Sequence, residues 1–167
     1  MKTTAQVTSI FHCSLERAFK TPILGDATQF LVGYGPVPAV IKFTDDATWG
    51  KPGGTRIPHS ADTLFSKGGP IGLDEVYERV ENTYWKWGIA KFLQPSMGFS
   101  EFRGEMFFTQ NEDGTVHVRW VYTLFSNSLA AYPFHWFFGK VFWKGQMQLG
   151  IRNMKRYAES DAAFLYE

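Results

Sequence analysis

The stretch TVHVRWVYTLF, residues 115–125, alternates apolar and polar side chains along most of its length. Its alternating apolar residues are Val116, Val118, Trp120, Tyr122 and Leu124. Because successive side chains of a strand point to opposite faces of a sheet, this pattern is typical of a strand with one apolar face. Arg119 falls on the other, largely polar face, where we expect it to meet solvent.

A second strand is predicted just before it, in EFRGEMFFT, residues 101–109. One side of this strand carries Phe102, Gly104, Met106 and Phe108, and the other carries charged side chains. The intervening NEDG, residues 111–114, has the residue types of a hairpin turn. We therefore expect the two strands to pair in antiparallel fashion.

Similar strands are predicted across residues 39–126, where short segments rich in Val, Ile, Phe, Trp and Tyr are separated by Gly, Pro, Asn and Asp. In YWKWGIAKF, residues 84–92, Trp85 and Trp87 share a face, and Lys91 falls on the same face near the end of the segment. The whole region indicates an antiparallel sheet.

Helical patterns flank the predicted sheet. After an opening strand, AQVTSIF at residues 5–11, SLERAFKTPIL at 14–24 has Ser14 as a helix cap and apolar residues at helical spacing. The segment ATQFLVGYGP, residues 27–36, predicts a second short helix that ends at its glycines and Pro36.

A long amphipathic helix is predicted at the C-terminus. Its apolar face comprises Trp136, Trp143, Met147, Ile151, Met154 and Ala158. Residues 134–142 are apolar on most sides, so the pattern does not fix where the helix begins. The aromatic stretch AYPFHWFFGKVFW, residues 131–143, suits a membrane or partner surface, an ordinary core, or the wall of a cavity for an apolar ligand.

Composition limits the class of protein. A chain of 167 residues fits a single domain, which we expect to span residues 1–167. The formal net charge of +1 argues against nucleic-acid binding, which needs a concentrated basic face. Aromatic residues make up 17% of the chain, and this excess is the feature that needs an explanation.

The expected location is cytoplasmic. Cys13 is the one cysteine, which excludes an intramolecular disulfide, and the opening MKTTAQVTSIFHC lacks the apolar core of a signal peptide. The charge-free run at residues 120–139 has the length of a membrane span, but it contains Ser126, Asn127, Pro133 and His135 and begins as a strand. We expect no membrane span.

Four segments occur in an order that resembles the START/SRPBCC helix-grip superfamily, especially its polyketide cyclase/dehydrase-like branch. They are SLERAF (14–19), WGKPGGTR (49–56), EVYERVENTYWKW (75–87) and EDGTVHVRW (112–120), followed by the C-terminal helix. The resemblance covers nearly the whole chain. It implies an α+β fold in which a curved seven-stranded antiparallel sheet wraps around a long C-terminal helix, with two short helices after the first strand.

The resemblance also implies an apolar cavity between sheet and helix that accepts lipids, steroids, polyketides or other aromatic molecules. The candidate ligand-binding residues are Trp85, Trp87, Phe102, Met106, Phe108, Trp120, Tyr122, Trp143 and Met147. These side chains either line a cavity or fill it. Tyr122 either directs its hydroxyl to a ligand or bonds to the backbone.

Metal, cofactor and hydrolase motifs are incomplete. His12, His59, His117 and His135 lack the spacing of metal ligands, so we expect no metal. GYGPVP (33–38) lacks the third glycine of a dinucleotide fingerprint, WGKPGGT (49–55) lacks the ending of a phosphate loop, and no G-x-S-x-G motif is present. We expect no cofactor.

The charged residues leave catalysis open. A buried glutamate could act as a general acid or base, although solvated strand faces explain the glutamates more simply. The candidates are Glu75, Glu78, Glu81, Glu101 and Glu105. Arg56 either holds an anionic group or has a structural role.

We expect a monomer or homodimer that binds an apolar or aromatic small molecule and is not primarily an enzyme. One alternative is an aromatase/cyclase or dehydratase-type enzyme that uses the same cavity. Another is a lipid-surface or protein interaction module in which Trp136–Trp143 forms an exposed patch.

Overall fold

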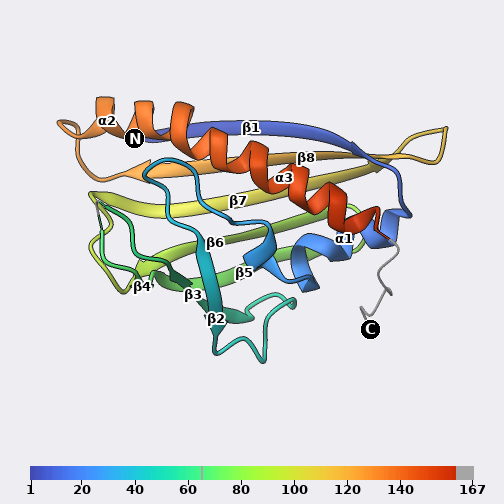
Figure 1. Cartoon of the computed structure of the whole chain (residues 1–167), viewed down its shortest axis with the longest axis horizontal. Coiled ribbons are helices and arrows are strands. Elements are labelled where there is room, and N and C mark those ends of the chain that lie inside the picture. Colours follow the sequence, from blue (N-terminus) through green and yellow to red (C-terminus); the bar gives the residue numbers. More distant parts are fainter. Residues whose placement is uncertain (65, 161–167) are drawn as a thin grey trace.

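Residues 1–64 and 66–160 are described by a computed structural model of the chain, shown in Figure 1. In chain order the first elements are β1 (Lys2–Phe11), α1 (Leu15–Leu24), the 3₁₀ turn η1 (Ala27–Gln29), β2 (Val40–Thr44), β3 (Thr55–Ser60) and β4 (Gly69–Pro70). They are followed by β5 (Gly72–Val80), β6 (Tyr84–Phe92), β7 (Phe99–Gln110), β8 (Val116–Ser126), α2 (Tyr132–Phe138), the π-helical segment η2 (Gly139–Trp143) and α3 (Lys144–Ala158).

The strands form one antiparallel sheet with the order β1-β8-β7-β6-β5-β3-β2, and the two-residue β4 pairs with β3 beside this path. The predicted hairpin is confirmed, since β7 pairs with β8 across the NEDG turn. In this pair Met106 lies opposite Trp120, and Gly104 lies opposite Tyr122. The predicted apolar face of each strand is therefore the face that the helices cover.

The C-terminal helix lies across the curved sheet, from α2 beside the N-terminus to the end of α3 beside α1 (Figure 1). Met147, Ile151, Met154 and Ala158 are buried along α3, as predicted. This arrangement of sheet and helix is the helix-grip fold expected from the sequence.

The prediction that Trp136 shares the buried face of the helix was wrong, because its side chain is 50% exposed. An α-helix turns about 100° per residue, which would align Trp136 with Trp143. In η2, however, the N–H of Lys144 donates to the carbonyl of Gly139, five residues back. A π turn rotates less per residue than an α turn, so Trp136 faces outward. His135 and Phe138 take the buried positions of α2 instead.

Of the two short helices predicted after β1, the first is α1, with ten residues, and the second is a single 3₁₀ turn of three residues. Ser14 caps α1 as predicted, with its Oγ accepting a hydrogen bond of 3.2 Å from the Arg17 N–H. The second is only the turn η1, whose first residues are held by the Asp26 side chain. The turn ends at Phe30, before Gly33 and Gly35, whose positive φ angles of 86° and 57° exclude a helix over the rest of the predicted segment.

One end of the sheet is filled by α1. Phe11, Phe19, Ile23, Val116 and Val118 are almost fully buried there. Phe19 of α1 meets Phe108 of β7 edge to face, with 5.2 Å between ring centroids. The space between sheet and helix is therefore closed at this end, and any cavity has to lie toward α2.

Candidate functional site

A cavity of about 1060 Å³ lies between the inner face of the sheet and the C-terminal helix. Its floor comes from β5, β6, β7 and β8, and one wall comes from η2 and α3. The segment from Phe30 to Phe43 and strand β3 complete the enclosure. This volume is at the upper end of the range typical of small-molecule sites, roughly 300–1,000 Å³.

Eight of the nine candidate ligand-binding residues lie in the cavity wall. They are Trp85, Trp87, Phe102, Met106, Trp120, Tyr122, Trp143 and Met147. Phe108 does not line the cavity, because it packs against Phe19 at the end of the sheet that α1 covers. The expectation that Phe108 lines the cavity was therefore wrong. The prediction that Phe108 lies on the same face of β7 as Phe102 and Met106 was correct.

The aromatic residues pack against one another and leave the cavity between them and α3. Trp85 stacks on Trp87 with 6.0 Å between ring centroids, and Trp143 meets Tyr122 at 4.9 Å and Phe102 at 5.1 Å. The sequence left open whether these side chains line a cavity or fill it, and in the structure they line one. Phe134, Phe138 and Phe142 extend the wall toward α2.

A buried ion pair lies in the wall, between strands β3 and β5. Arg56 and Asp74 are opposite each other in the register, and the Arg56 Nε–H donates to Asp74 Oδ2 at 3.2 Å. The guanidinium lies between two rings, 4.0 Å from the centroid of Phe43 and 3.6 Å from that of Trp49. Burial lowers the pKa of Arg56, and the negative charge of Asp74 and the attraction of the ring faces for a cation act against this effect. The role of Arg56, left open by the sequence, is thus to pair with Asp74.

Asp74 is the acidic residue of the cavity, and sequence reasoning missed it. Its position alternates with Gly72 and Val76, so strand parity could have placed it on the inner face. The glutamates that were considered do not line the cavity. Glu101 accepts a hydrogen bond from the Arg103 Nε–H at 2.8 Å, and Glu105 accepts one from the Tyr84 hydroxyl at 2.6 Å.

Burial dominates the electrostatics of the pair. It raises the pKa of Asp74 from 3.8 to about 6, although the positive charge of Arg56 and its hydrogen bond act in the opposite direction. Burial also raises the pKa of Tyr122 well above 10, and the nearby negative charge of Asp74 adds to this effect. At neutral pH, Asp74 is thus mostly ionised and Tyr122 keeps its proton.

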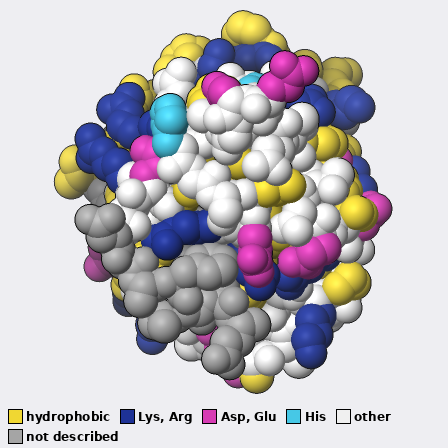
Figure 2. Space-filling view, turned by 90° about the vertical axis from the view of Figure 1, so that its right-hand side faces the viewer, with side chains coloured by type: hydrophobic (Ala, Val, Ile, Leu, Met, Phe, Trp, Pro, Cys, Tyr) yellow, Lys and Arg dark blue, Asp and Glu magenta, His cyan; other side chains and the backbone are white. Residues whose placement is uncertain are grey.

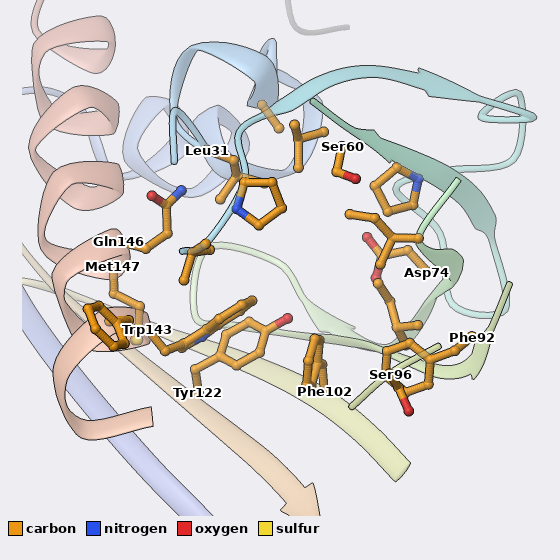
Figure 3. Close-up of a pocket in the computed structure, with 18 of the residues that line it drawn as sticks. Leu31, Ser60, Asp74, Phe92, Ser96, Phe102, Tyr122, Trp143, Gln146 and Met147 are labelled. Carbon is orange, nitrogen blue, oxygen red and sulfur yellow. The ribbon is translucent and has the colours of Figure 1, made fainter. Parts of the chain in front are cut away.

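Polar atoms without a partner are concentrated around the cavity. Among the described residues, the buried atoms that lack a hydrogen bond include Asp74 Oδ1, Gln146 Oε1, Trp120 Nε1 and Trp143 Nε1, all from residues that line the cavity. Figure 3 shows the Asp74 carboxyl and the Tyr122 hydroxyl directed into the same hollow, with Gln146 on the side formed by α3. Such atoms are a small fraction of a wall that is otherwise apolar.

The opening of the cavity lies at the α2 end. Its lining includes the exposed residues Lys67, Met97 and Phe134, from three separate segments. His135 of α2 holds the β6–β7 loop in place: its Nε2–H donates to the Met97 carbonyl at 2.8 Å, and Nδ1 is 2.6 Å from Ser126 Oγ. Its ring also stacks on Phe99 at 4.0 Å.

Exposed apolar side chains occur in α2, in η2 and in the loops before β7 and α2, and two of them, Met97 and Phe134, also line the cavity. Leu93, Met97, Leu129, Phe134, Trp136, Phe137 and Val141 are between 42% and 79% exposed. At the opposite end of the molecule, Figure 2 shows Lys, Arg, Asp and Glu side chains interspersed with hydrophobic ones. The stretch 131–143 therefore contributes both to the cavity wall and to an exposed apolar surface.

Neither a metal site nor a membrane-spanning helix is found among the described residues. Within residues 1–64 and 66–160, no three His, Cys, Asp or Glu side chains come together as a metal site would require. In the same part of the chain, no helix is both long enough and apolar enough to cross a bilayer.

No protein-family model and no curated protein matches this chain. Among solved structures, Ara h 8.0201 is similar with a TM-score of 0.69 and 14% identity, over 95% of this chain and 98% of that one. The Staphylococcus aureus protein SA2116, of unknown function, has a TM-score of 0.67 and 14% identity, over 95% and 94%. CV1439 from Chromobacterium violaceum has a TM-score of 0.64 and 12% identity, over 95% and 99%. At these identities the likeness establishes the helix-grip fold alone.

Proposed function

We propose that this protein binds an apolar or aromatic small molecule in the cavity between its sheet and C-terminal helix. The observation that carries the proposal is a volume of about 1060 Å³ walled mainly by ring and aliphatic side chains. Trp85, Trp87, Phe102, Met106, Trp120, Tyr122, Trp143 and Met147 are the proposed contacts. Lipids, steroids and polyketide-like molecules have suitable chemistry.

The energetics of cavities support this proposal. Truncation series give about 24 cal/mol per Å³ of empty apolar volume, which would amount to roughly 25 kcal/mol here. That exceeds the whole stability of an ordinary domain, about 5–15 kcal/mol. Solvent or a ligand therefore fills the space, and water finds few polar partners on such a wall. An apolar molecule that replaces this water gains favourable burial.

Native mass spectrometry of the purified protein tests the proposal. The sample is then denatured, its apolar fraction is extracted, and the released masses are compared with the mass difference in the native spectrum. We expect a stoichiometric molecule of apolar character. A clean apo mass, together with no saturable binding of a polycyclic probe such as 1-methylpyrene, would contradict the proposal. The same native spectrum distinguishes a monomer from a homodimer.

A cytoplasmic location is part of the proposal. Cys13 is a free cysteine, as suits a reducing compartment. Fractionation of cells that express a tagged full-length chain tests this location, and recovery in an oxidising compartment would contradict it.

A second candidate function is catalysis of the aromatase/cyclase or dehydratase type. The observation in its favour is Asp74, a buried carboxyl with a raised pKa in the cavity wall, facing the same hollow as the Tyr122 hydroxyl. Such a group can exchange a proton near neutral pH. Turnover of a reactive polyketide-type chain that is lost in both Asp74→Asn and Tyr122→Phe would support catalysis over simple binding.

A third candidate function is attachment to a lipid surface. It is favoured by the exposed apolar residues of α2, Phe134, Trp136 and Phe137, which are 48–50% exposed. Tryptophan and phenylalanine are typical of protein surfaces that insert into the bilayer interface. Flotation with phosphatidylcholine vesicles tests this function. Flotation that is lost in Trp136→Ser/Phe137→Ser supports it, and protein that stays at the bottom of the gradient argues against it.

A further inference from the structure

Among the described residues, Asp74 is the acidic residue in the cavity wall. It is only 5% exposed, and its carboxyl points into the hollow (Figure 3). One carboxyl oxygen, Oδ2, accepts the hydrogen bond from Arg56, whereas Oδ1 has no partner. A buried carboxyl oxygen without a donor is costly for a folded protein. Oδ1 is itself covered from solvent, so a donor on a ligand satisfies this acceptor as the side chains around Asp74 adjust to the ligand.

Tyr122 supplies the complementary group. It is 7% exposed, its hydroxyl points into the same hollow, and no hydrogen bond within the described part of the chain engages that hydroxyl. A phenolic hydroxyl both donates and accepts. A ligand hydroxyl between these residues can donate to the Asp74 carboxyl and accept from Tyr122.

The charges in the wall select against ionised ligands. Arg56 already faces Asp74 at 3.2 Å, so the pair has no net charge to balance a buried cation or anion. The guanidinium is also covered on its faces by Phe43 and Trp49. Lys67, a further charged lining residue, is exposed at the opening. A neutral polar group therefore fits the inner part of the cavity better than a carboxylate or an ammonium.

We propose that the cavity selects neutral, polycyclic molecules that carry a hydroxyl group, with the hydroxyl donating to Asp74 and accepting from Tyr122. This inference rests on the proposed binding of an apolar molecule and specifies the polar group of that molecule. The aromatic wall receives the ring system, and the hydroxyl fixes its orientation.

Three probes of similar shape test the inference at pH 7: 1-hydroxypyrene, 1-methylpyrene and pyrene-1-carbaldehyde. Their dissociation constants are measured by the quenching of tryptophan fluorescence. We expect the wild-type protein to bind 1-hydroxypyrene at least about tenfold more tightly than 1-methylpyrene, as hydrogen bonds to charged groups typically provide. In Tyr122→Phe, which removes the hydroxyl and keeps the ring, the ratio of the two affinities should fall several-fold.

Asp74→Asn should reverse the preference. The amide oxygen of the substituted side chain is expected to keep the hydrogen bond from Arg56, which leaves the amide NH₂, a donor, facing the cavity. Pyrene-1-carbaldehyde, which only accepts, should then bind more tightly than 1-hydroxypyrene. Tyr84→Phe is the matched control, because it also removes a tyrosine hydroxyl, but one that donates to Glu105 and lies outside the cavity wall.

The outcomes separate this inference from the function on which it rests. Equal affinities of the wild-type protein for all three probes would overturn the hydroxyl selection and leave apolar binding intact. Failure of all three to bind would overturn both. A hydroxyl preference that Tyr122→Phe leaves unchanged would also overturn the inference, and this holds even if Asp74→Asn does not fold.

Discussion

The indole of Trp87 lies directly over Gly104, so closely that a methyl group on the Gly104 Cα would come within 2.5 Å of the ring. The two residues face each other across neighbouring strands β6 and β7. The missing side chain lets the ring lie against the sheet, and this leaves room above it for the cavity. The size of the site thus depends on a glycine that does not itself appear in the cavity wall.

Gly104→Ala should push the Trp87 indole into the cavity and weaken binding. Overpacking of a core typically costs about 1–3 kcal/mol, and a cost near the lower end of this range, expressed in binding, would weaken the affinity for 1-methylpyrene by about tenfold. Fluorescence titration checks the loss. The double variant Gly104→Ala/Trp87→Leu provides the control, since a smaller residue at position 87 should restore binding. Unchanged affinity in the single variant would show that Trp87 does not limit the cavity.

Ionisation of Asp74 should lower the stability of the fold as the pH rises. Its pKa is raised from 3.8 to about 6, so the folded state keeps a proton that the unfolded state has lost between these values. The stabilisation is fully present below about pH 4 and is lost as the pH passes through 6. The stability of Asp74→Asn relative to the wild-type protein should therefore increase between pH 4 and pH 7, by about 2 kcal/mol.

Urea unfolding across this pH range measures the effect of Asp74, and Asp26 offers a control of opposite sign. Hydrogen bonds from Thr28 lower the pKa of Asp26, so its stabilisation is present at neutral pH and is lost on acidification. Asp26→Asn should accordingly lose stability relative to the wild-type protein as the pH rises. A relative stability of Asp74→Asn that falls with rising pH would mean that the attraction to Arg56 outweighs the burial of the carboxyl.

His135→Phe should loosen the rim of the cavity. The phenyl ring can keep the stacking on Phe99 but loses the hydrogen bonds to Met97 and Ser126. Loss of a buried hydrogen bond costs about 1–3 kcal/mol, because the partner is left unsatisfied. Hydrogen exchange should become faster in the backbone of residues 96–99. His12→Ala is the control, because its side chain is 66% exposed, and equal exchange rates in both variants would contradict a role for His135 at the rim.

Phe108 and Phe102 should behave differently when truncated, although both lie on the inner face of β7. Phe108→Ala should lower stability by about 3–5 kcal/mol and leave the affinity of the remaining folded protein for 1-methylpyrene unchanged. Phe102→Ala should lower the affinity itself, because Phe102 lines the cavity. Thermal unfolding combined with titration separates the two effects. A similar loss of affinity in both variants would show that Phe108 also contributes to ligand binding.

Strand parity is the part of the site that the sequence predicts well. Because side chains alternate along a strand, Trp85, Phe102, Trp120 and Tyr122 are assigned to the inner face without any structure. Parity does not tell how far along a strand the cavity extends. That limit is set by Phe19 of α1, which meets Phe108 from a distant part of the chain.

The ion pair was harder to predict, because its two halves come from different strands. Asp74 follows the alternation of β5, but the register of β5 with β6 shifts between Leu73 and Asp74 and again between Val76 and Glu78. The second shift separates the buried Val76 from the exposed Glu78, two residues that simple parity would place together. Only the pairing of β3 with β5 shows that Arg56 faces Asp74.

The π-helical segment Gly139–Trp143 has a consequence for how this chain tolerates changes in length. A π turn holds one more residue than the α turn it replaces, while the helices on either side keep their orientation. Deleting Val141, which is exposed and does not line the cavity, should therefore produce a continuous α-helix in which Phe138 still faces inward and Trp136 still faces outward. Insertions and deletions usually scramble the faces of a helix, but at this position the chain can lose a residue and keep both the wall of the cavity and the surface around its opening.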